Sequence, residues 1–227
     1  MSNSEASAMA LKRFVYVIES PSSMDLLENH LEGEALVKAL DLAAIPRYYS
    51  LVTDRATFRR ALLERMTAAL QYYEKAEAIP ILHLSMHGDD SGIGLTCGER
   101  LSWEELRQEL SLLIEGLNSG LLICMSTCFG SSGCRMAWHT SEPFGFLVGN
   151  EDSVDWADAA VAYITFYHLL FKGYPIQECV SAMNRASRNM RFRLDSGKES
   201  KERWLLWQNF KLSLERREDF YAGWSRF

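Results

Sequence analysis

Short apolar runs alternate with longer segments of helical periodicity along most of this chain. The apolar runs predict strands at residues 13–20, 47–52, 79–86, 121–125 and 144–149. Apolar residues at helical spacing predict helices over 28–44, from a Thr53 cap to about residue 75, over 155–172, and from Pro175 into the 180s. Ser102 and Glu105 have the spacing of a capping box, which predicts the start of one more helix.

The predicted strands are apolar throughout rather than alternating, which is typical of a parallel sheet buried on both faces. Strands that alternate with helices connect by right-handed crossovers, so helices cover both faces. The sequence therefore predicts an α/β fold, a three-layer α/β/α sandwich with a mostly parallel central sheet. No repeat or linker divides the chain, so we expect a single domain over 11–227 after a disordered segment, 1–10. Over 191–227 the pattern weakens, and RWLLWQNFKLSL fits either an edge strand or a helix.

The net charge, the apolar runs and the cysteines limit the classes of function that we expect for the chain. The net charge of −6 gives no reason to expect nucleic acid or an anionic membrane surface as a partner. The first residues lack the layout of a signal peptide, and the longest apolar run, Ala159–Phe171, is too short to span a bilayer. The five cysteines follow no disulfide framework. We therefore expect a cytoplasmic protein with free thiols.

Chemically reactive residues follow two of the predicted strands. His87 and Gly88 come directly after one apolar run, and a polar loop is predicted to follow them. Cys128 comes after a later apolar run. Because parallel strands end at the same edge of a sheet and neighbours lie about 5 Å apart, the imidazole and the thiol can meet there. A cysteine nucleophile needs such an imidazole. The Gly88 and Cys128 amides are then candidate donors to an oxyanion.

Each of these residues also has a structural interpretation. A lone cysteine is more often a small core residue than a nucleophile. Cys124, inside an apolar run, is expected to pack in the core. His83 is expected to be a buried strand residue, or alternatively one that orients His87. The remaining cysteines have no supported role: Cys97, Cys134 and Cys179.

A zinc site is the other possibility for this part of the chain. The candidate ligands are Cys124, Cys128, Cys134 and His139, or His83 with His87. No C-x-x-C pair is present, and a cysteine in a strand interior points away from a site in a loop. The pattern therefore disfavours a metal, and we expect no cofactor.

Together these motifs resemble the caspase-like (clan CD) cysteine peptidases, most closely their bacterial CHAT branch. The resemblance rests on ILHLSMHGDDSGIGL, then LSWEELRQEL, then LLICMSTCFGSSG. It continues through FGFLVG and a helix ending in FY-x-x-L-x-x-G, and it covers about residues 11–188. In such a family a strand ending in His-Gly precedes a strand leading to Ser-(small)-Cys.

The resemblance implies that Cys128 is the nucleophile and His87 the general acid/base, with the Gly88 amide in the oxyanion hole. The implied reaction is hydrolysis of peptide bonds in a specific protein substrate through an acyl-enzyme, without a cofactor. The family demands no third catalytic carboxylate, and none stands out in the sequence. Many CHAT relatives act in bacterial defence or cell death, which implies a similar setting and an activating or regulatory protein partner.

The resemblance also implies where the substrate side chain before the cut binds. The corresponding positions are Glu19 or Ser20, Ser126, and Glu151 or Asp152. Arg-preferring relatives often have Asp in place of Ser126, and Asp-preferring caspases have Gln. The remaining acids favour a basic or neutral side chain and repel an acidic one. Alternatively, Glu151, Asp152 and Asp155 serve as first-turn helix charges and a cap.

A different class of function is a catalytically silent binding module that acts through a partner interface. The last quarter of the chain is rich in aromatic residues, namely Trp204, Trp207, Phe210, Phe220, Tyr221 and Trp224. Aromatic residues are favoured at interfaces, but they also pack as core. The charged segment Arg185–Trp204 is either a solvated helix end and loop or a processing or docking site. A zinc-dependent hydrolase is a third alternative.

Overall fold

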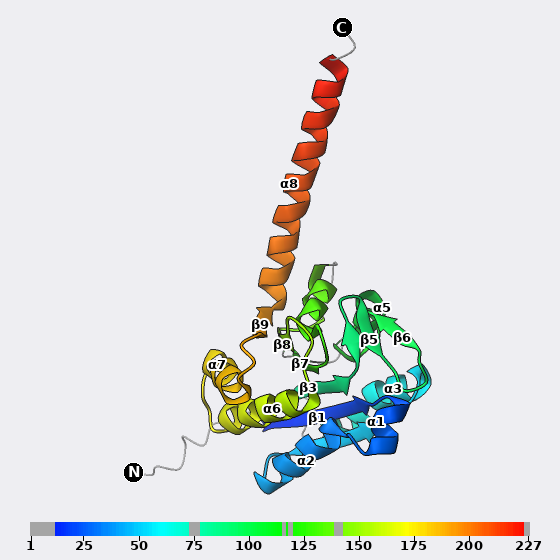
Figure 1. Ribbon diagram of the computed structural model, residues 1–227, viewed down its shortest axis with the longest axis vertical. Helices are drawn as coiled ribbons and strands as arrows, with labels where there is room; N and C mark the ends of the chain where they lie inside the picture. Colours follow the sequence, from blue (N-terminus) through cyan, green and yellow to red (C-terminus); the bar gives the residue numbers. More distant parts are fainter. Residues whose placement is uncertain (1–11, 73–77, 115–116, 118–119, 139–142, 225–227) are drawn as a thin grey trace.

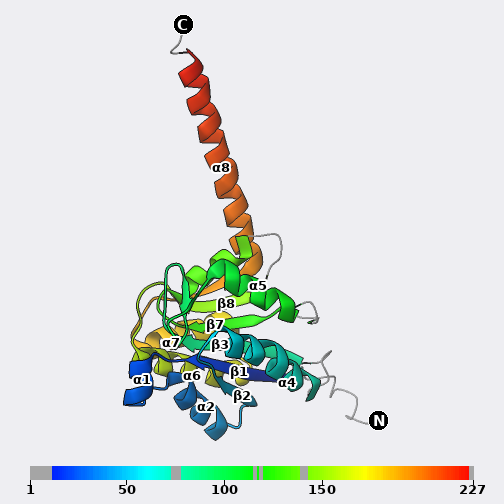
Figure 2. The ribbon, with the colours of Figure 1, turned by 90° about the vertical axis from the view of Figure 1, so that its right-hand side faces the viewer.

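The computed structural model describes residues 12–72, 78–114, 117, 120–138 and 143–224. A six-stranded sheet runs through the centre of the domain in the order β2-β1-β3-β7-β8-β9 (Figures 1 and 2). Its strands are β1 (Lys12–Ser20), β2 (Arg47–Leu51), β3 (Ala78–Met86), β7 (Leu122–Ser126), β8 (Phe146–Asn150) and β9 (Phe192–Ser196). The first five in this order pair in parallel, and only β9 is antiparallel. The prediction of a mostly parallel sheet is therefore confirmed.

Helices cover both faces of the sheet. One face packs against α2 (Glu32–Leu42), α6 (Trp156–Phe171) and α7 (Ile176–Ser187). The other packs against α3 (Arg55–Arg60), the π-helix η1 (Ala61–Arg65), α4 (Met66–Tyr72), α5 (Trp103–Ile114) and the 3₁₀ helix η2 (Gly130–Trp138). Each face has its own buried apolar cluster, so the three-layer α/β/α sandwich is confirmed.

A second, smaller sheet follows His87, where the sequence predicted a polar loop. It consists of β4 (Gly88–Asp89), β5 (Gly92–Gly94) and β6 (Arg100–Ser102), paired antiparallel. The loop prediction was wrong because strands of two or three residues are too short to show a period in the sequence. This small sheet leads into α5, which begins with the predicted capping box: the Ser102 amide donates to the Glu105 carboxylate at 2.9 Å.

Two helix boundaries differ from the predictions. The helix expected over 28–44 is α2, but it begins only at Glu32. The unpredicted helix α1 (Ser23–Glu28) precedes it and ends where Asn29 adopts the left-handed conformation (φ 57°). The expected Thr53 cap is also incorrect. Asp54 caps α3, and its carboxylate accepts from the Thr57 amide at 2.8 Å.

The last helix, α8 (Gly197–Trp224), projects away from the domain (Figures 1 and 2). RWLLWQNFKLSL is therefore helical, and the edge strand β9 precedes it. Trp204 stacks on Trp138 with ring centroids 4.4 Å apart, whereas Trp207 and Phe210 are 51% and 61% exposed. The aromatic residues beyond these, and the segment 1–10 expected to be disordered, lie outside the residues whose side chains are described. Within the described chain, no helix has both the length and the apolar character needed to cross a membrane.

Candidate active site

The pairing of β3 with β7 brings His87 and Cys128 to the same edge of the sheet. The last residues in register are Ser85 of β3 and Ser126 of β7, and each reactive residue follows two positions later. His87 and Cys128 line one pocket of about 190 Å³. The rest of its lining is Met86, Thr127, Val154, Asp155 and Trp156. The prediction that the two strands are neighbours is therefore confirmed.

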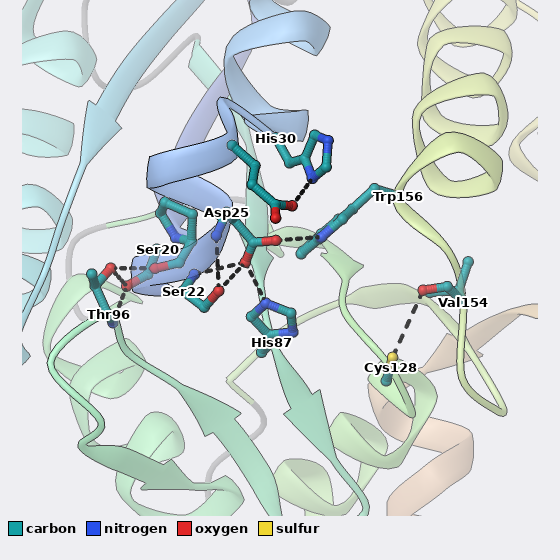
Figure 3. Close-up of polar contacts among 11 residues, drawn as sticks. Ser20, Ser22, Asp25, His30, His87, Thr96, Cys128, Val154 and Trp156 are labelled. Atoms are coloured by element: carbon teal, nitrogen blue, oxygen red, sulfur yellow. Dashed lines mark hydrogen bonds and ion pairs between the residues drawn. The ribbon is translucent and has the colours of Figure 1, made fainter.

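A tight turn after β7 presents the thiol. Phe129 has a φ of 54°, a strained conformation for a bulky residue, and its amide donates to the Asp152 carbonyl at 2.9 Å. The Gly130 amide donates to the Thr127 carbonyl at 3.2 Å. Cys128 is half-buried, and its Sγ lies 3.8 Å from the Val154 carbonyl oxygen (Figure 3). These contacts fix the turn and leave the thiol at the pocket wall.

Glycines allow the turn to pack closely on its neighbours. A Cβ at Gly88 would lie 2.2 Å from the Thr127 hydroxyl oxygen, so the chain after His87 touches the segment that carries Cys128. A Cβ at Gly149 of β8 would lie 2.5 Å from the Gly130 carbonyl carbon and 2.6 Å from the Ser131 nitrogen. The two halves of the candidate site are thus held together by backbone contact.

The Gly88 amide faces away from its partner strand. The Gly94 amide donates to the His87 carbonyl at 2.9 Å, which makes these two residues a hydrogen-bonded pair of the small sheet. Hydrogen-bonded and non-hydrogen-bonded pairs alternate along an antiparallel ladder, so the next pair, Gly88 with Ile93, is non-hydrogen-bonded. The Gly88 N–H therefore points out of the ladder and is not engaged by the partner strand, although Gly88 is not among the residues that line the pocket. Its role as an oxyanion donor stays a prediction.

His87 is bound by a carboxylate that the sequence did not single out. Its Nε2 lies 2.6 Å from Oδ2 of Asp25, and the Trp156 ring meets the imidazole edge-on at a centroid distance of 5.2 Å (Figure 3). No third carboxylate stood out in the sequence, but the structure places Asp25 beside the imidazole. The sequence does contain a usable signal: Ser22 and Asp25 have capping-box spacing directly after a strand that ends at the same sheet edge.

Several donors converge on the Asp25 carboxylate. Oδ2 also accepts from the Ser22 amide at 2.9 Å, and Oδ1 accepts from the Trp156 indole at 3.3 Å. Burial acts to raise the pKa of Asp25, but hydrogen bonds from Ser22 and His87 outweigh it and lower the pKa to about 2. Asp25 is thus ionised at neutral pH. Since a carboxylate only accepts hydrogen bonds, His87 Nε2 carries a proton and Nδ1 is the nitrogen left for the pocket.

Glu19, expected to contact substrate, lies under α2 and does not line the pocket. Its carboxylate accepts from the Gly33 and Glu34 amides at 2.8 and 3.0 Å and from the Tyr49 hydroxyl at 2.7 Å. Burial raises its pKa. The alternative position, Ser20, is also buried, and its hydroxyl donates to the Val52 carbonyl. Glu19 therefore stabilises the first turn of α2.

The other expected specificity residues do not converge on the pocket either. Glu151 pairs with Arg193 at 2.9 Å, and Asp152 pairs with Arg191 at 3.5 Å. Ser126 is fully buried, and its hydroxyl has no hydrogen-bond partner among the described residues. The acid that does line the pocket is Asp155, which was interpreted in the sequence only as a helix-end residue.

Cys124 and His83 belong to the core on the α6 side of the sheet. Burial raises the pKa of Cys124 to about 12, which makes it unreactive. His83 Nδ1 lies 3.0 Å from the Tyr167 hydroxyl, so His83 does not orient His87. Within the described part of the chain, no group of three or more His, Cys, Asp or Glu residues is arranged to hold a metal ion. His139, one of the candidate zinc ligands, lies outside the described residues.

Comparisons with known proteins bear on the fold. No family model matches the chain, and no curated protein matches it. Among solved structures, the chain is similar to a secreted C11 cysteine protease from Bacteroides thetaiotaomicron, iotapain. The TM-score is 0.57 at 10% sequence identity, over 83% of this chain and 67% of that one. The chain therefore has the caspase-like α/β fold of a C11 cysteine protease.

Proposed function

We propose that the chain is a cysteine endopeptidase in which Cys128 is the nucleophile and His87 the general acid/base. One observation carries this proposal: a thiol and an imidazole, placed at the ends of two adjacent parallel strands, line the same pocket. The similarity to the fold of a C11 protease supports it. Action on a specific protein, an activating partner, a cytoplasmic location, the CHAT branch and a setting in bacterial defence remain predictions from the sequence.

The proposed reaction has two steps. The Cys128 thiolate attacks the scissile carbonyl carbon and forms the S–C bond, while the Gly88 and Cys128 amides stabilise the oxyanion. His87 gives its proton to the leaving nitrogen as the C–N bond breaks, which yields an acyl-enzyme and a free amine. His87 then takes a proton from water, whose oxygen attacks the acyl carbon. Breakage of the S–C bond releases the acid and restores the thiolate and the protonated imidazole.

The substrate preference follows from the charge of the pocket. Asp155 lines it beside Cys128, and the lining residues include no lysine or arginine. We expect peptides with a basic or neutral residue before the cut to be cleaved at least about tenfold faster than peptides with Asp there. Cleavage of a peptide library, with the new termini sequenced by mass spectrometry, measures this preference. A clear preference for Asp would contradict it.

Alkylation of the five cysteines tests the proposed pair directly. We expect iodoacetamide to label Cys128 faster than the exposed Cys97, because an adjacent imidazole promotes the reactive thiolate. In His87→Ala, labelling of Cys128 should slow at least about tenfold while labelling of Cys97 stays the same. Mass spectrometry gives the rate for each cysteine separately. Equal, slow labelling of Cys128 in both proteins would argue instead for the silent binding module.

The binding module is retained as a second candidate because of α8. Trp207 and Phe210 are exposed on a helix that projects from the domain (Figure 1). Large exposed aromatic residues are typical of interaction surfaces. If the chain is a silent module, binding of a partner should require this helix and should not require the Cys128 thiol.

A further inference from the structure

We propose that Asp25 is a positioning residue that holds the His87 imidazole with Nδ1 toward the pocket. This inference rests on the proposed peptidase function and adds a third member to the pair. Its basis is the contact between Asp25 Oδ2 and His87 Nε2, 2.6 Å long, which engages the ring nitrogen remote from the reaction (Figure 3). Since an imidazole has two nitrogens, fixing one of them decides where the other points.

The carboxylate is itself held in place, as a positioning group must be. Ser22 and Asp25 form a reciprocal capping box at the start of α1: the Ser22 amide donates to Oδ2, and the Asp25 amide donates to the Ser22 hydroxyl at 3.1 Å. A capping carboxylate needs only these partners. Here Oδ2 also accepts a hydrogen bond from His87 Nε2, and Oδ1 accepts one from the Trp156 indole N–H. Three segments of the chain therefore converge on one side chain that is 12% exposed.

Trp156 constrains the imidazole from a second direction. Its ring packs edge-on against His87 at 71° between the ring planes, and its Nε1 donates to the same Asp25 carboxylate. Rotation of the imidazole would break the 2.6 Å hydrogen bond and the edge-on contact with the indole. The His87 side chain is otherwise 51% exposed, so its orientation depends on these two neighbours.

The charged groups near the imidazole are mainly acidic. Asp25 faces it from α1, and Asp155 and Cys128 line the same pocket from the segments before α6 and after β7. Asp89 of β4 is paired with Arg100 and contributes less. A nearby negative charge stabilises an imidazolium, and an imidazolium stabilises a thiolate. Loss of the Asp25 charge should therefore make Cys128 less reactive near neutral pH.

The test is the pH dependence of Cys128 alkylation in Asp25→Asn, a variant of nearly equal size. Iodoacetamide labelling is followed from about pH 5 to 9, the range in which an imidazole and a thiol titrate. We expect labelling at neutral pH to be at least about tenfold slower than in wild type, and half-maximal labelling to move to higher pH. With a cleavable peptide in hand, kcat should fall while KM stays the same.

Asp54→Asn is the matched control, because Asp54 is also a capping-box carboxylate but contacts no histidine. At an N-cap position Asn caps as well as Asp, so Asp54→Asn should keep the wild-type melting temperature and labelling rate. Asp25 is the N3 partner of the Ser22 cap, so the melting temperature of Asp25→Asn is measured alongside its labelling rate. His87→Ala separates the two proposals. If Asp25→Asn labels like wild type while His87→Ala is slow, the inference about Asp25 is overturned and the peptidase proposal stands. If wild type is as slow as His87→Ala, both are overturned.

A second variant keeps the test decisive if Asp25→Asn does not fold. Trp156→Phe keeps an aromatic ring beside His87 and removes the indole N–H that binds Oδ1. We expect the labelling profile to shift in the same direction, by about threefold at neutral pH, since the variant loses one hydrogen bond to the Asp25 carboxylate. A profile identical to that of wild type would contradict the positioning role.

Discussion

Replacing Cys128 with alanine is expected to abolish peptide cleavage, with a loss of at least about a thousandfold in kcat/KM. The proposed acyl-enzyme needs a bond between Sγ and the substrate carbonyl carbon, and alanine offers no atom that can form it. The fold should survive, because Cys128 lies in a turn at the pocket wall and is only half-buried. The measurement is the rate at which new amino termini appear in a peptide mixture, together with the melting temperature.

Cys97→Ala provides the control for this experiment. Cys97 is the exposed free thiol of the described chain, and its Sγ donates to the Glu99 carboxylate at 3.4 Å, away from the pocket. This variant should cleave peptides at the wild-type rate. Cleavage that persists in Cys128→Ala but disappears in Cys97→Ala would assign the chemistry to another part of the molecule.

Replacing Gly149 with alanine is expected to destabilise the protein by about 3 kcal/mol and to lower activity sharply. The new Cβ would meet backbone atoms of Gly130 and Ser131 at 2.5 to 2.6 Å, and backbone cannot move aside as a flexible side chain can. Relief requires β8 to separate from the turn that follows Cys128. Thermal unfolding should show a melting temperature lower by about 6 to 12 °C, as expected for a chain of this size.

Gly94→Ala tests whether the effect comes from the contact rather than from loss of a glycine. Gly94 is also in a strand, but its Cβ would meet the His87 carbonyl oxygen at 3.8 Å, an ordinary van der Waals distance. Its stability should stay within about 0.5 kcal/mol of wild type. If both variants unfold at the same temperature, close packing beneath the Cys128 turn does not limit stability.

The sheet was predictable because its strands are buried on both faces, and that burial shows in the sequence as uninterrupted apolar runs. The small sheet after His87 left no such pattern, because its strands are short and rich in glycine. β9 was missed for a related reason: as an edge strand it exposes charged residues such as Arg193, whose pattern resembles a loop.

The candidate site was predictable to the extent that it depends on strand ends. His87 and Cys128 each follow a buried strand, so parallel pairing alone brings them to one edge. The position that the resemblance implied for Glu19 does not line the pocket, because a strand end gives the edge but not the face, and the Glu19 carboxylate accepts from the first turn of α2. Asp25 was missed because its position depends on the turn that begins α1 and on an indole far along the chain.

The residues around the His87 imidazole lie far apart along the chain, and this separation decides when the site can form during synthesis. Asp25 and His87 are 62 positions apart, and Asp25 and Trp156 are 131 positions apart. Such contacts can form only after the intervening chain has been synthesised. A nascent chain that has passed Cys128 still lacks the Val154 carbonyl and the indole that complete the surroundings of the thiol and the imidazole. The ribosome must therefore produce the first turn of α6 before any copy of this protein has an assembled site, so that unfinished chains are inactive.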